Sequence, residues 1–299
     1  MEVRQVRYFT EIVRHGSFTK AAEQLHVAQP AISMAIRNLE EELDVILLNR
    51  RDRKISLTAE GEVFLEHCRR ILTDLAAARQ AIDDMRGLLK GQVRVGIPPM
   101  LSIYFFPDII CDFTRAYPDL RMSVSSEGAS LIRQMISEGD IDMGVIAGSA
   151  PEDLEAWHFL REEVVACVPP DHPFAARRTV TFAEFRSEPL IFYKEGYYLR
   201  ELISGMRMET GEPLNIVFET NLFSLVRTLI RRGIGISASL RMVVSADSEV
   251  VAVPFDPPLH LDLKIAWKKN AYLSRANRAF VDFLLEQTKG YGVSGQTNG

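Results

Sequence analysis

The segment from Ser17 to Gly61 constrains the fold of this chain more than any other part of the sequence. In its second half, apolar residues recur at spacings of four, three and four, which places them on one face of an α-helix. These residues are Ile32, Ile36, Leu39 and Leu43. Because such a stripe must be buried, we expect this helix to pack on the core of a small domain and to leave its other face outside.

A shorter helix is expected just before this one. Ser17 or Thr19 can cap its start, and Leu25 supplies an apolar anchor. Ala21 and Ala22 are small enough to let two helices pack closely. A short turn then joins the two helices, so the segment has the spacing of a helix-turn-helix.

The outer face of the second helix is the expected DNA-reading surface. Residues that point away from the apolar stripe, or lie at the helix start, are Gln29, Pro30, Ala31, Ser33, Met34 and Arg37. Exposed N–H groups at a helix start favour phosphate. A small helical domain of any function can carry the same spacing, so this pattern alone leaves a purely structural helix pair open.

A basic segment follows between two apolar runs, residues 45–48 and 55–57. Its cations are Arg50, Arg51, Arg53 and Lys54. This arrangement predicts a short β-wing with cations at its tip, where arginine can enter the minor groove of DNA.

Together these residues resemble the LysR-type bacterial transcriptional regulators. The resemblance rests on Ser17, Thr19, Ala21, Ala22, Leu25, Gln29, Pro30, Ala31, Ile32, Ser33, Ile36, Leu39, Glu40, Leu43, Arg50, Leu57, Thr58 and Gly61. The chain departs from the family at Asp44, where glycine is usual, at Leu48, where phenylalanine is usual, and at Met34 and Ala35, where many members have polar or basic side chains. The resemblance implies an α/β protein with an N-terminal winged helix-turn-helix, a long linker helix and a two-lobed periplasmic-binding-protein-like effector domain.

The charge of the chain does not by itself favour nucleic acid. The net charge is −5, and residues 1–60 contain as many Lys and Arg as Asp and Glu. Physiological salt screens exposed charges beyond about 8 Å, so the basic segment can act independently of Glu40, Glu41 and Glu42. The DNA-binding prediction therefore depends on where the cations lie.

Composition agrees with a cytoplasmic protein with more than one core, and the resemblance implies that it associates with the nucleoid. Of the 299 residues, 47% are hydrophobic and 25% are charged. We expect neither a membrane span nor a signal peptide, because no apolar stretch has the required length. Cys68, Cys111 and Cys167 lack the spacing of a disulfide framework or a zinc site, so we expect no metal or cofactor.

Residues 62–90 are expected to form a linker helix between a DNA-binding domain at 1–61 and an effector-binding domain at 91–289. Apolar residues close to a three-four repeat are Leu65, Cys68, Leu72, Leu75, Ile82 and Leu89. This stripe predicts a dimer seam, and packing onto the same chain is the alternative. The resemblance implies that such dimers pair into homotetramers, and it suggests RNA polymerase as a further partner.

From residue 91 onward, short apolar strands alternate with helices, which predicts a parallel α/β architecture. The resemblance implies two lobes joined by two crossovers, with lobe I at about 91–161 and 267–289 and lobe II at about 162–266. The polar, glycine-rich tail at 290–299 is expected to be disordered.

Ligands of open α/β sheets bind at the carboxyl ends of the strands. The loops and helix starts expected there contain Pro99, Met100, Leu101, Ser102, Gly128, Ala147, Tyr193, Tyr197, Tyr198, Thr220, Asn221 and Ser224. We expect these residues to bind the effector.

The effector is expected to be a small carboxylate or an aromatic acid. Two prolines, Pro98 and Pro99, remove N–H donors and leave the amides of Met100, Leu101 and Ser102 as an anion nest. The tyrosines offer ring faces and hydroxyls to the same ligand. An ordinary helix start and tyrosines that only stabilise the lobe are the alternatives.

Other classes of function find less support in the sequence. The histidines are scattered, and neither a G-x-S-x-G nor a Walker-type motif occurs, so we expect no enzyme. An exported solute-binding protein would need a signal peptide, and an architectural DNA-binding protein would not need a cleft. We therefore expect a sequence-specific transcriptional regulator whose binding to double-stranded operator DNA is modulated by a small metabolite bound between the lobes.

Overall fold

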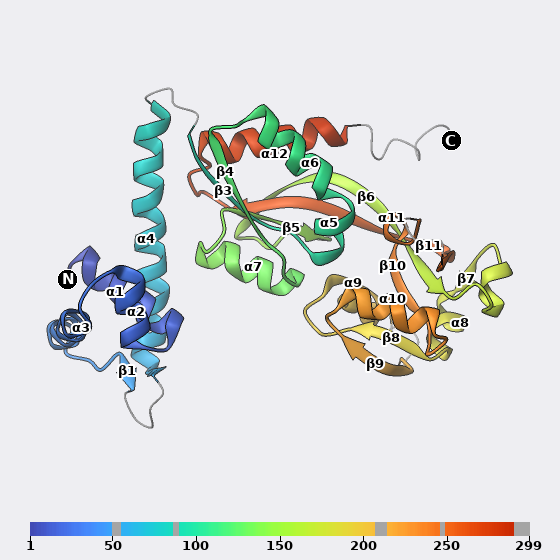
Figure 1. Ribbon diagram of the computed structural model, residues 1–299, viewed down its shortest axis with the longest axis horizontal. Helices are drawn as coiled ribbons and strands as arrows, with labels where there is room; N and C mark the ends of the chain where they lie inside the picture. Colours follow the sequence, from blue (N-terminus) through green and yellow to red (C-terminus); the bar gives the residue numbers. More distant parts are fainter. Residues whose placement is uncertain (50–54, 86–89, 207–213, 246–248, 290–299) are drawn as a thin grey trace. The chain divides into compact units, whose positions relative to one another are not determined.

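The computed structural model describes residues 1–49, 55–85, 90–206, 214–245 and 249–289 (Figure 1). The chain divides into two compact units, Met1–Leu88 and Leu89–Gly299. The basic segment at 50–54 and the tail at 290–299, for which the sequence predicts a wing tip and disorder, lie outside the described residues.

The first unit consists of helices and one small antiparallel sheet. Its described elements are α1 (Val3–His15), α2 (Phe18–Leu25), α3 (Gln29–Leu43), β1 (Leu48–Asn49), β2 (Ser56–Leu57) and α4 (Ala59–Met85). Strands β1 and β2 pair through Leu48 with Leu57 and through Asn49 with Ser56. The predicted order of helix, turn, helix and hairpin is therefore present.

The apolar stripe of α3 is buried, with one exception. Ile32, Ile36 and Leu39 are fully buried in a core that also contains Phe9. The expectation for Leu43 was wrong, because this side chain is 37% exposed. Helix α3 ends at Leu43, so the last residue of the stripe extends past the core.

Local backbone chemistry explains how the helices of the first unit begin and end. Ser17 caps α2, since its hydroxyl accepts a hydrogen bond from the amide of Lys20. Asp44 ends α3 with a φ of 53°, in the left-handed region that aspartate tolerates better than most residues. The family's usual glycine is therefore replaced here without a change of backbone conformation.

The second unit is an α/β structure. Its first described elements are β3 (Gly91–Gly96), α5 (Pro99–Tyr104), α6 (Phe106–Ala116), β4 (Leu120–Ser125), α7 (Ala129–Glu138), β5 (Met143–Ala147) and β6 (Leu154–Val168). They are followed by η1 (Pro173–Ala176), β7 (Val180–Thr181), α8 (Phe182–Ser187), β8 (Leu190–Tyr193), α9 (Tyr198–Met206), β9 (Ile216–Thr220), α10 (Phe223–Arg231), β10 (Ser237–Leu240), α11 (Arg241–Ser245), β11 (Val251–Lys268) and α12 (Arg275–Thr288).

The strands form a seven-stranded sheet in the order β10-β6-β11-β5-β3-β4, with β7 beside β11, and a separate pair, β8-β9. The predicted parallel pairing holds for β3 with β4, for β3 with β5, and for β8 with β9. Strands β6 and β11 instead run antiparallel to each other, because each carries the chain from one lobe to the other. The fold is mixed α/β with two crossovers.

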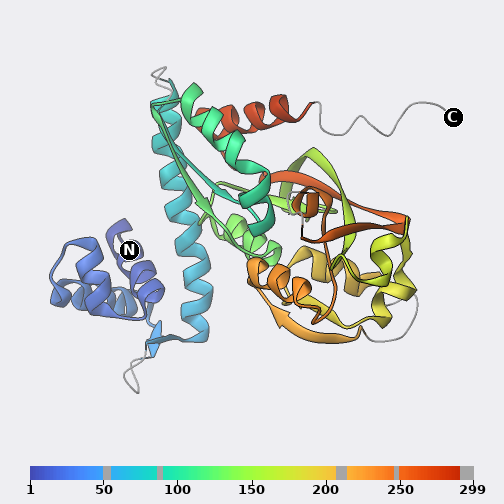
Figure 2. The ribbon, with the colours of Figure 1, turned by 45° about the vertical axis from the view of Figure 1, so that its right-hand side comes forward.

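Two lobes follow from these crossovers (Figures 1 and 2). In lobe I, α6 and α12 cover one face of the sheet and α7 covers the other (Figure 1). Lobe II contains β7 to β10 and α8 to α11. Strands β6, of 15 residues, and β11, of 18 residues, belong to both lobes.

The return of the chain to lobe I comes earlier than the expected residue 267. Leu263–Trp267 of β11 already pairs with β5 of lobe I. A continuous apolar strand gives no sign in the sequence of where its pairing partner changes. We therefore place this boundary near Leu263.

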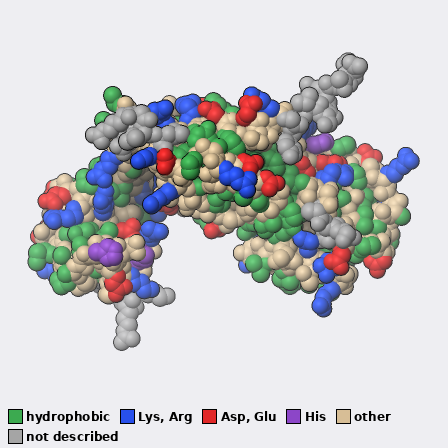
Figure 3. Space-filling view, turned by 45° about the horizontal axis from the view of Figure 1, so that its top comes forward, with side chains coloured by type: hydrophobic (Ala, Val, Ile, Leu, Met, Phe, Trp, Pro, Cys, Tyr) green, Lys and Arg blue, Asp and Glu red, His purple; other side chains and the backbone are tan. Residues whose placement is uncertain are grey.

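Charges of both signs are interspersed over the visible face (Figure 3), which agrees with the small net charge of −5. In the described part of the chain, no helix has the length and apolarity that a membrane span requires. Cys68 and Cys167 are buried and Cys111 is exposed, all as free thiols. Burial raises the pKa of the Cys68 thiol to about 12, so this thiol is unreactive near neutral pH.

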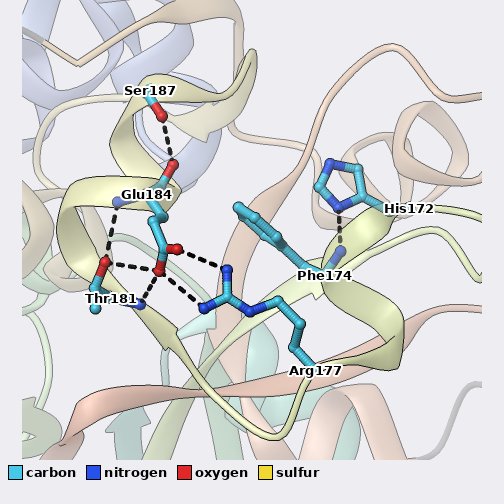
Figure 4. Close-up of polar contacts among 6 residues, drawn as sticks. All are labelled: His172, Phe174, Arg177, Thr181, Glu184 and Ser187. Atoms are coloured by element: carbon cyan, nitrogen blue, oxygen red, sulfur yellow. Dashed lines mark hydrogen bonds and ion pairs between the residues drawn. The ribbon is translucent and has the colours of Figure 1, made fainter.

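A polar network fixes the start of α8 in lobe II (Figure 4). The Glu184 carboxylate accepts two bonds from Arg177, at 2.7 and 3.2 Å, and bonds from the amide and hydroxyl of Thr181, at 2.9 and 2.8 Å. Thr181 in turn accepts from the Glu184 amide, which completes a capping box. The Arg177 guanidinium and then Thr181 lower the pKa of Glu184 from 4.5 to about 2.

We predict that Glu184→Gln lowers the melting temperature at pH 7. A carboxyl whose pKa is lower in the folded than in the unfolded protein stabilises the fold above its unfolded pKa, and this stabilisation is lost as pH falls through the folded value. The difference in melting temperature between Glu184→Gln and wild type should therefore become smaller as pH falls from about 4.5 to about 2. Thermal melts across this range, with the exposed Glu152→Gln as control, measure it, and a gap that does not change with pH would contradict the assignment.

Candidate functional site

The outer face of helix α3 carries both polar and apolar side chains. Gln29, Pro30, Ala31, Met34 and Arg37 are exposed, and Met34 reaches 66%. Ser33 is half-buried. The structure thus brings the six predicted α3 residues onto the surface of one helix, opposite the buried stripe.

The hairpin beside α3 is held by side chains whose role the sequence does not show. One oxygen of Glu40 accepts the amides of Leu47 and Leu48, at 3.0 and 3.2 Å. The Thr58 hydroxyl donates to the carbonyl of Ile46 and accepts from the amide of Gly61. The Glu40 carboxylate thus anchors β1 to α3.

The base of the hairpin therefore has a fixed position in the first unit. A Cβ at Gly61 would collide with the carbonyl of Leu47, so only glycine fits there. The predicted cations Arg50, Arg51, Arg53 and Lys54 belong to the connection between β1 and β2, outside the described residues.

A cavity of about 60 Å³ lies between the two lobes of the second unit. It is lined by Pro98, Pro99, Met100, Leu101, Ala129, Val145, Ile146, Ala147, Tyr193, Tyr197, Tyr198, Leu199, Asn221, Phe223, Leu240, Leu261 and Leu263. Residues from β5, α5 and α7 of lobe I face residues from β8, α9 and α10 of lobe II.

Eight of the twelve predicted effector residues line this cavity. They are Pro99, Met100, Leu101, Ala147, Tyr193, Tyr197, Tyr198 and Asn221. The other four, Ser102, Gly128, Thr220 and Ser224, do not line it.

Local bonds explain why two of the predicted hydroxyls turn elsewhere. The Ser102 hydroxyl donates to the carbonyl of Pro99 at 2.8 Å, and its amide donates to Pro98. The buried Thr220 hydroxyl accepts the amide of Leu222 at 3.0 Å. The predicted anion nest is therefore wrong for Ser102, because its amide is already part of the first turn of α5.

Nine lining residues were missed by the sequence analysis: Pro98, Ala129, Val145, Ile146, Leu199, Phe223, Leu240, Leu261 and Leu263. Most are apolar residues inside or at the start of strands and helices, whereas the prediction selected loop residues. Alternation along β5 and β11 could have pointed to some of them, but only with their pairing known.

The three tyrosines occupy different environments. Tyr193 is 2% exposed, and its hydroxyl interacts with the side chains of Ser237 and Ser239. Burial raises the pKa of this phenol. Burial also raises the pKa of Tyr197, with a further contribution from Glu127, and that of Tyr198, with further contributions from Glu201 and Asp262.

Contacts between the lobes flank the cavity on one side. Helix α7 of lobe I meets lobe II where the amide of Ser130 donates to the carbonyl of Gly196, at 3.2 Å. The Ser130 hydroxyl donates to Glu201 at 2.9 Å, and Arg133 lies 3.5 Å from the same carboxylate. Because a Cβ on Gly128 would lie 2.8 Å from the Gly196 carbonyl oxygen, this approach requires glycine.

On the other side, Arg227 of α10 donates to the hydroxyl of Tyr104 of α5 at 2.5 Å. We call these two sets of contacts the interlobe latch. Within the described residues, no group of three or more His, Cys, Asp or Glu side chains is arranged to hold a metal ion.

Comparison with known proteins gives the same division of the chain. Residues 3–62 match the model described as bacterial regulatory helix-turn-helix protein, lysR family, and residues 86–289 match LysR substrate binding domain. An uncharacterized HTH-type transcriptional regulator of Bacillus subtilis, YwbI, is 33% identical over 295 residues, which cover 97% of both proteins.

Solved structures share the fold. A full-length OxyR variant from Pseudomonas aeruginosa superposes with a TM-score of 0.77 at 23% identity, covering 95% of this chain and 94% of that one. Full-length CbnR in complex with its target DNA superposes with a TM-score of 0.67 at 21% identity, covering 96% of this chain and 99% of that one.

Proposed function

The chain belongs to the LysR family of bacterial transcriptional regulators, and we propose that α3 reads its operator while a small metabolite in the interlobe cavity controls that reading. The family consists of DNA-binding regulators with an effector-binding domain, and its members are not enzymes. The observation that carries the proposal is the occurrence, in one chain, of a helix with an exposed polar face and a two-lobed domain with a cavity between its lobes.

Gln29 and Ser33 are the residues to which we assign base recognition. They lie one helical turn apart on α3, and Gln29 sits at its first turn. An amide side chain can pair with adenine through two hydrogen bonds, and a serine hydroxyl can pair with either base type. Arg37 continues the same line of side chains and can reach bases or phosphate.

We predict that Gln29→Ala and Ser33→Ala each reduce discrimination between operator and scrambled DNA by about 1–3 kcal/mol. Gln287→Ala removes an exposed amide from α12 of the other unit and serves as control. Titration of both DNAs by fluorescence anisotropy at one fixed salt concentration measures the difference. Equal losses on the two DNAs would reassign these residues to phosphate contacts.

Control by a metabolite requires a ligand that binds one lobe arrangement better than another. We propose two arrangements of the lobes. In one, the hydrogen bonds of the interlobe latch are formed, as in the structure; in the other, the lobes have changed their angle and these bonds are broken. Both sets of latch contacts involve elements that also line the cavity, α7 and α9 in one set and α5 and α10 in the other. A ligand that fills the cavity therefore changes the relative populations of the two arrangements.

We predict that Ala147→Leu abolishes the response of the regulator to its effector. Ala147 lines the cavity and is 5% exposed, so three added carbons occupy the ligand's space. A reporter fused to the regulated promoter, titrated with metabolites that raise the wild-type melting temperature, gives the response. Ala156→Leu, a half-buried strand alanine outside the lining, is the control. A wild-type response in Ala147→Leu would place the effector elsewhere.

We also propose that α4 pairs two chains and that the pairs form tetramers. Leu65 and Cys68 lie in the core of the first unit, so the alternative of packing onto the same chain holds for them. Further along the 27-residue helix, Ile82 is 54% exposed. The seam that we propose therefore lies in the second half of α4.

We predict that Ile82→Asp lowers the mass of the assembly, since a charge in an apolar seam is costly to bury. Analytical ultracentrifugation measures the mass, with Ile234→Asp as control because Ile234 is 50% exposed on the second unit. If Ile82→Asp folds and keeps the wild-type mass, α4 does not form the interface through this residue.

A further inference from the structure

The lining of the interlobe cavity is almost entirely apolar. Among the described residues that form it, none is lysine, arginine or histidine. The polar side chains are Asn221 and the three tyrosines, all uncharged near neutral pH. A carboxylate bound among these side chains would lack a cationic partner.

Backbone donors do not replace the missing cation. Pro98 and Pro99 have no N–H group, and the amide and hydroxyl of Ser102 are bonded within α5 and to Ser126. Helix α5 is also short, with six residues, so its dipole is small. The expected anion nest at this helix start is therefore reduced to the amides of Met100 and Leu101, at the end of a weak dipole.

The charges around the cavity also disfavour an anion. Glu127 acts on Tyr197, and Glu201 and Asp262 act on Tyr198. Arg133, whose charge acts on Tyr198 in the opposite sense, is paired with Glu201. These carboxylates would repel an acidic ligand near the tyrosines.

Arg227 is the next cation to consider, and it lies outside the lining of the larger cavity. Arg227 lines a smaller space of about 10 Å³ on the far side of Tyr193. Its guanidinium is held by the Tyr104 hydroxyl as part of the latch. It does not line the larger cavity.

The buried tyrosine hydroxyl does not add a polar anchor to the larger cavity. Tyr193 lines this cavity, but its hydroxyl interacts with the side chains of Ser237 and Ser239. These two serines line the smaller space and not the larger cavity. The site therefore offers apolar contact on most sides.

We propose that the interlobe cavity binds an uncharged, largely apolar small molecule. This inference rests on the proposed function of the cavity as the effector site. It replaces the carboxylate that the sequence led us to expect.

The size of the cavity links this ligand to the latch. A cavity of roughly 150 Å³ is known to hold benzene, whereas this one has about 60 Å³. A ring-sized ligand therefore enters only if the lobes move apart, which strains the contact between Ser130 and Gly196. Binding and lobe opening are then one event.

The test uses three probes with the same ring: benzyl alcohol, benzoate and benzylamine. Their affinities for the full-length protein are measured by calorimetry, with Ala147→Leu to locate the site and Ala156→Leu as matched control. We expect benzyl alcohol to bind wild type and Ala156→Leu alike, and to bind Ala147→Leu at least ~10-fold more weakly. Benzoate and benzylammonium should bind wild type at least ~10-fold more weakly than the alcohol.

A charged probe that binds this site as tightly as the alcohol would overturn the proposal. The absence of alcohol binding up to its solubility limit would do the same.

Operator binding distinguishes this inference from the function on which it rests. If benzoate binds in the cavity and changes the operator footprint, the ligand class is wrong and the proposed function stands. If benzyl alcohol binds as expected, and neither it nor any metabolite that occupies the cavity changes the footprint, the ligand class stands and the proposed function fails.

Discussion

The antiparallel pairing of β6 with β11 is the constraint on which the second unit depends. Residues along Leu154–Val168 pair with residues along Val251–Lys268, while β10 extends the pair in lobe II and β5 extends it in lobe I. The same two strands belong to both lobes and join them. Leu261 and Leu263 of β11 line the cavity, so a ligand placed there would contact one of the two strands that connect the lobes.

The first unit shows how residues of the sequence motif act through geometry. Glu40 and Gly61 act on the same short segment, one by accepting the amides of Leu47 and Leu48 and the other by leaving room for the Leu47 carbonyl. Periodicity predicted the helices and the buried face of α3, because burial follows directly from apolar spacing. It could not predict the role of Glu40, since a carboxylate in an acidic run looks solvated until its partners are known.

The same limit explains which parts of the candidate site could be predicted. The rule that ligands lie at the carboxyl ends of strands located Ala147, Tyr193 and the tyrosines after it. It failed for Ser102, because a hydroxyl in the first turn of a helix can bond to its own backbone. It missed the leucines of β11, because the face that a strand residue occupies depends on pairing partners distant in the sequence.

The close approach of Gly128 to Gly196 has a genetic consequence. At this point the two lobes are separated by less than the thickness of a side chain, and even one methyl group does not fit. A wedge at residue 128 would push the lobes apart in the direction that we assign to ligand binding. A single substitution of Gly128 by a small residue could therefore give a constitutively active regulator. Such a variant would have an unchanged DNA-reading helix and an unchanged cavity lining.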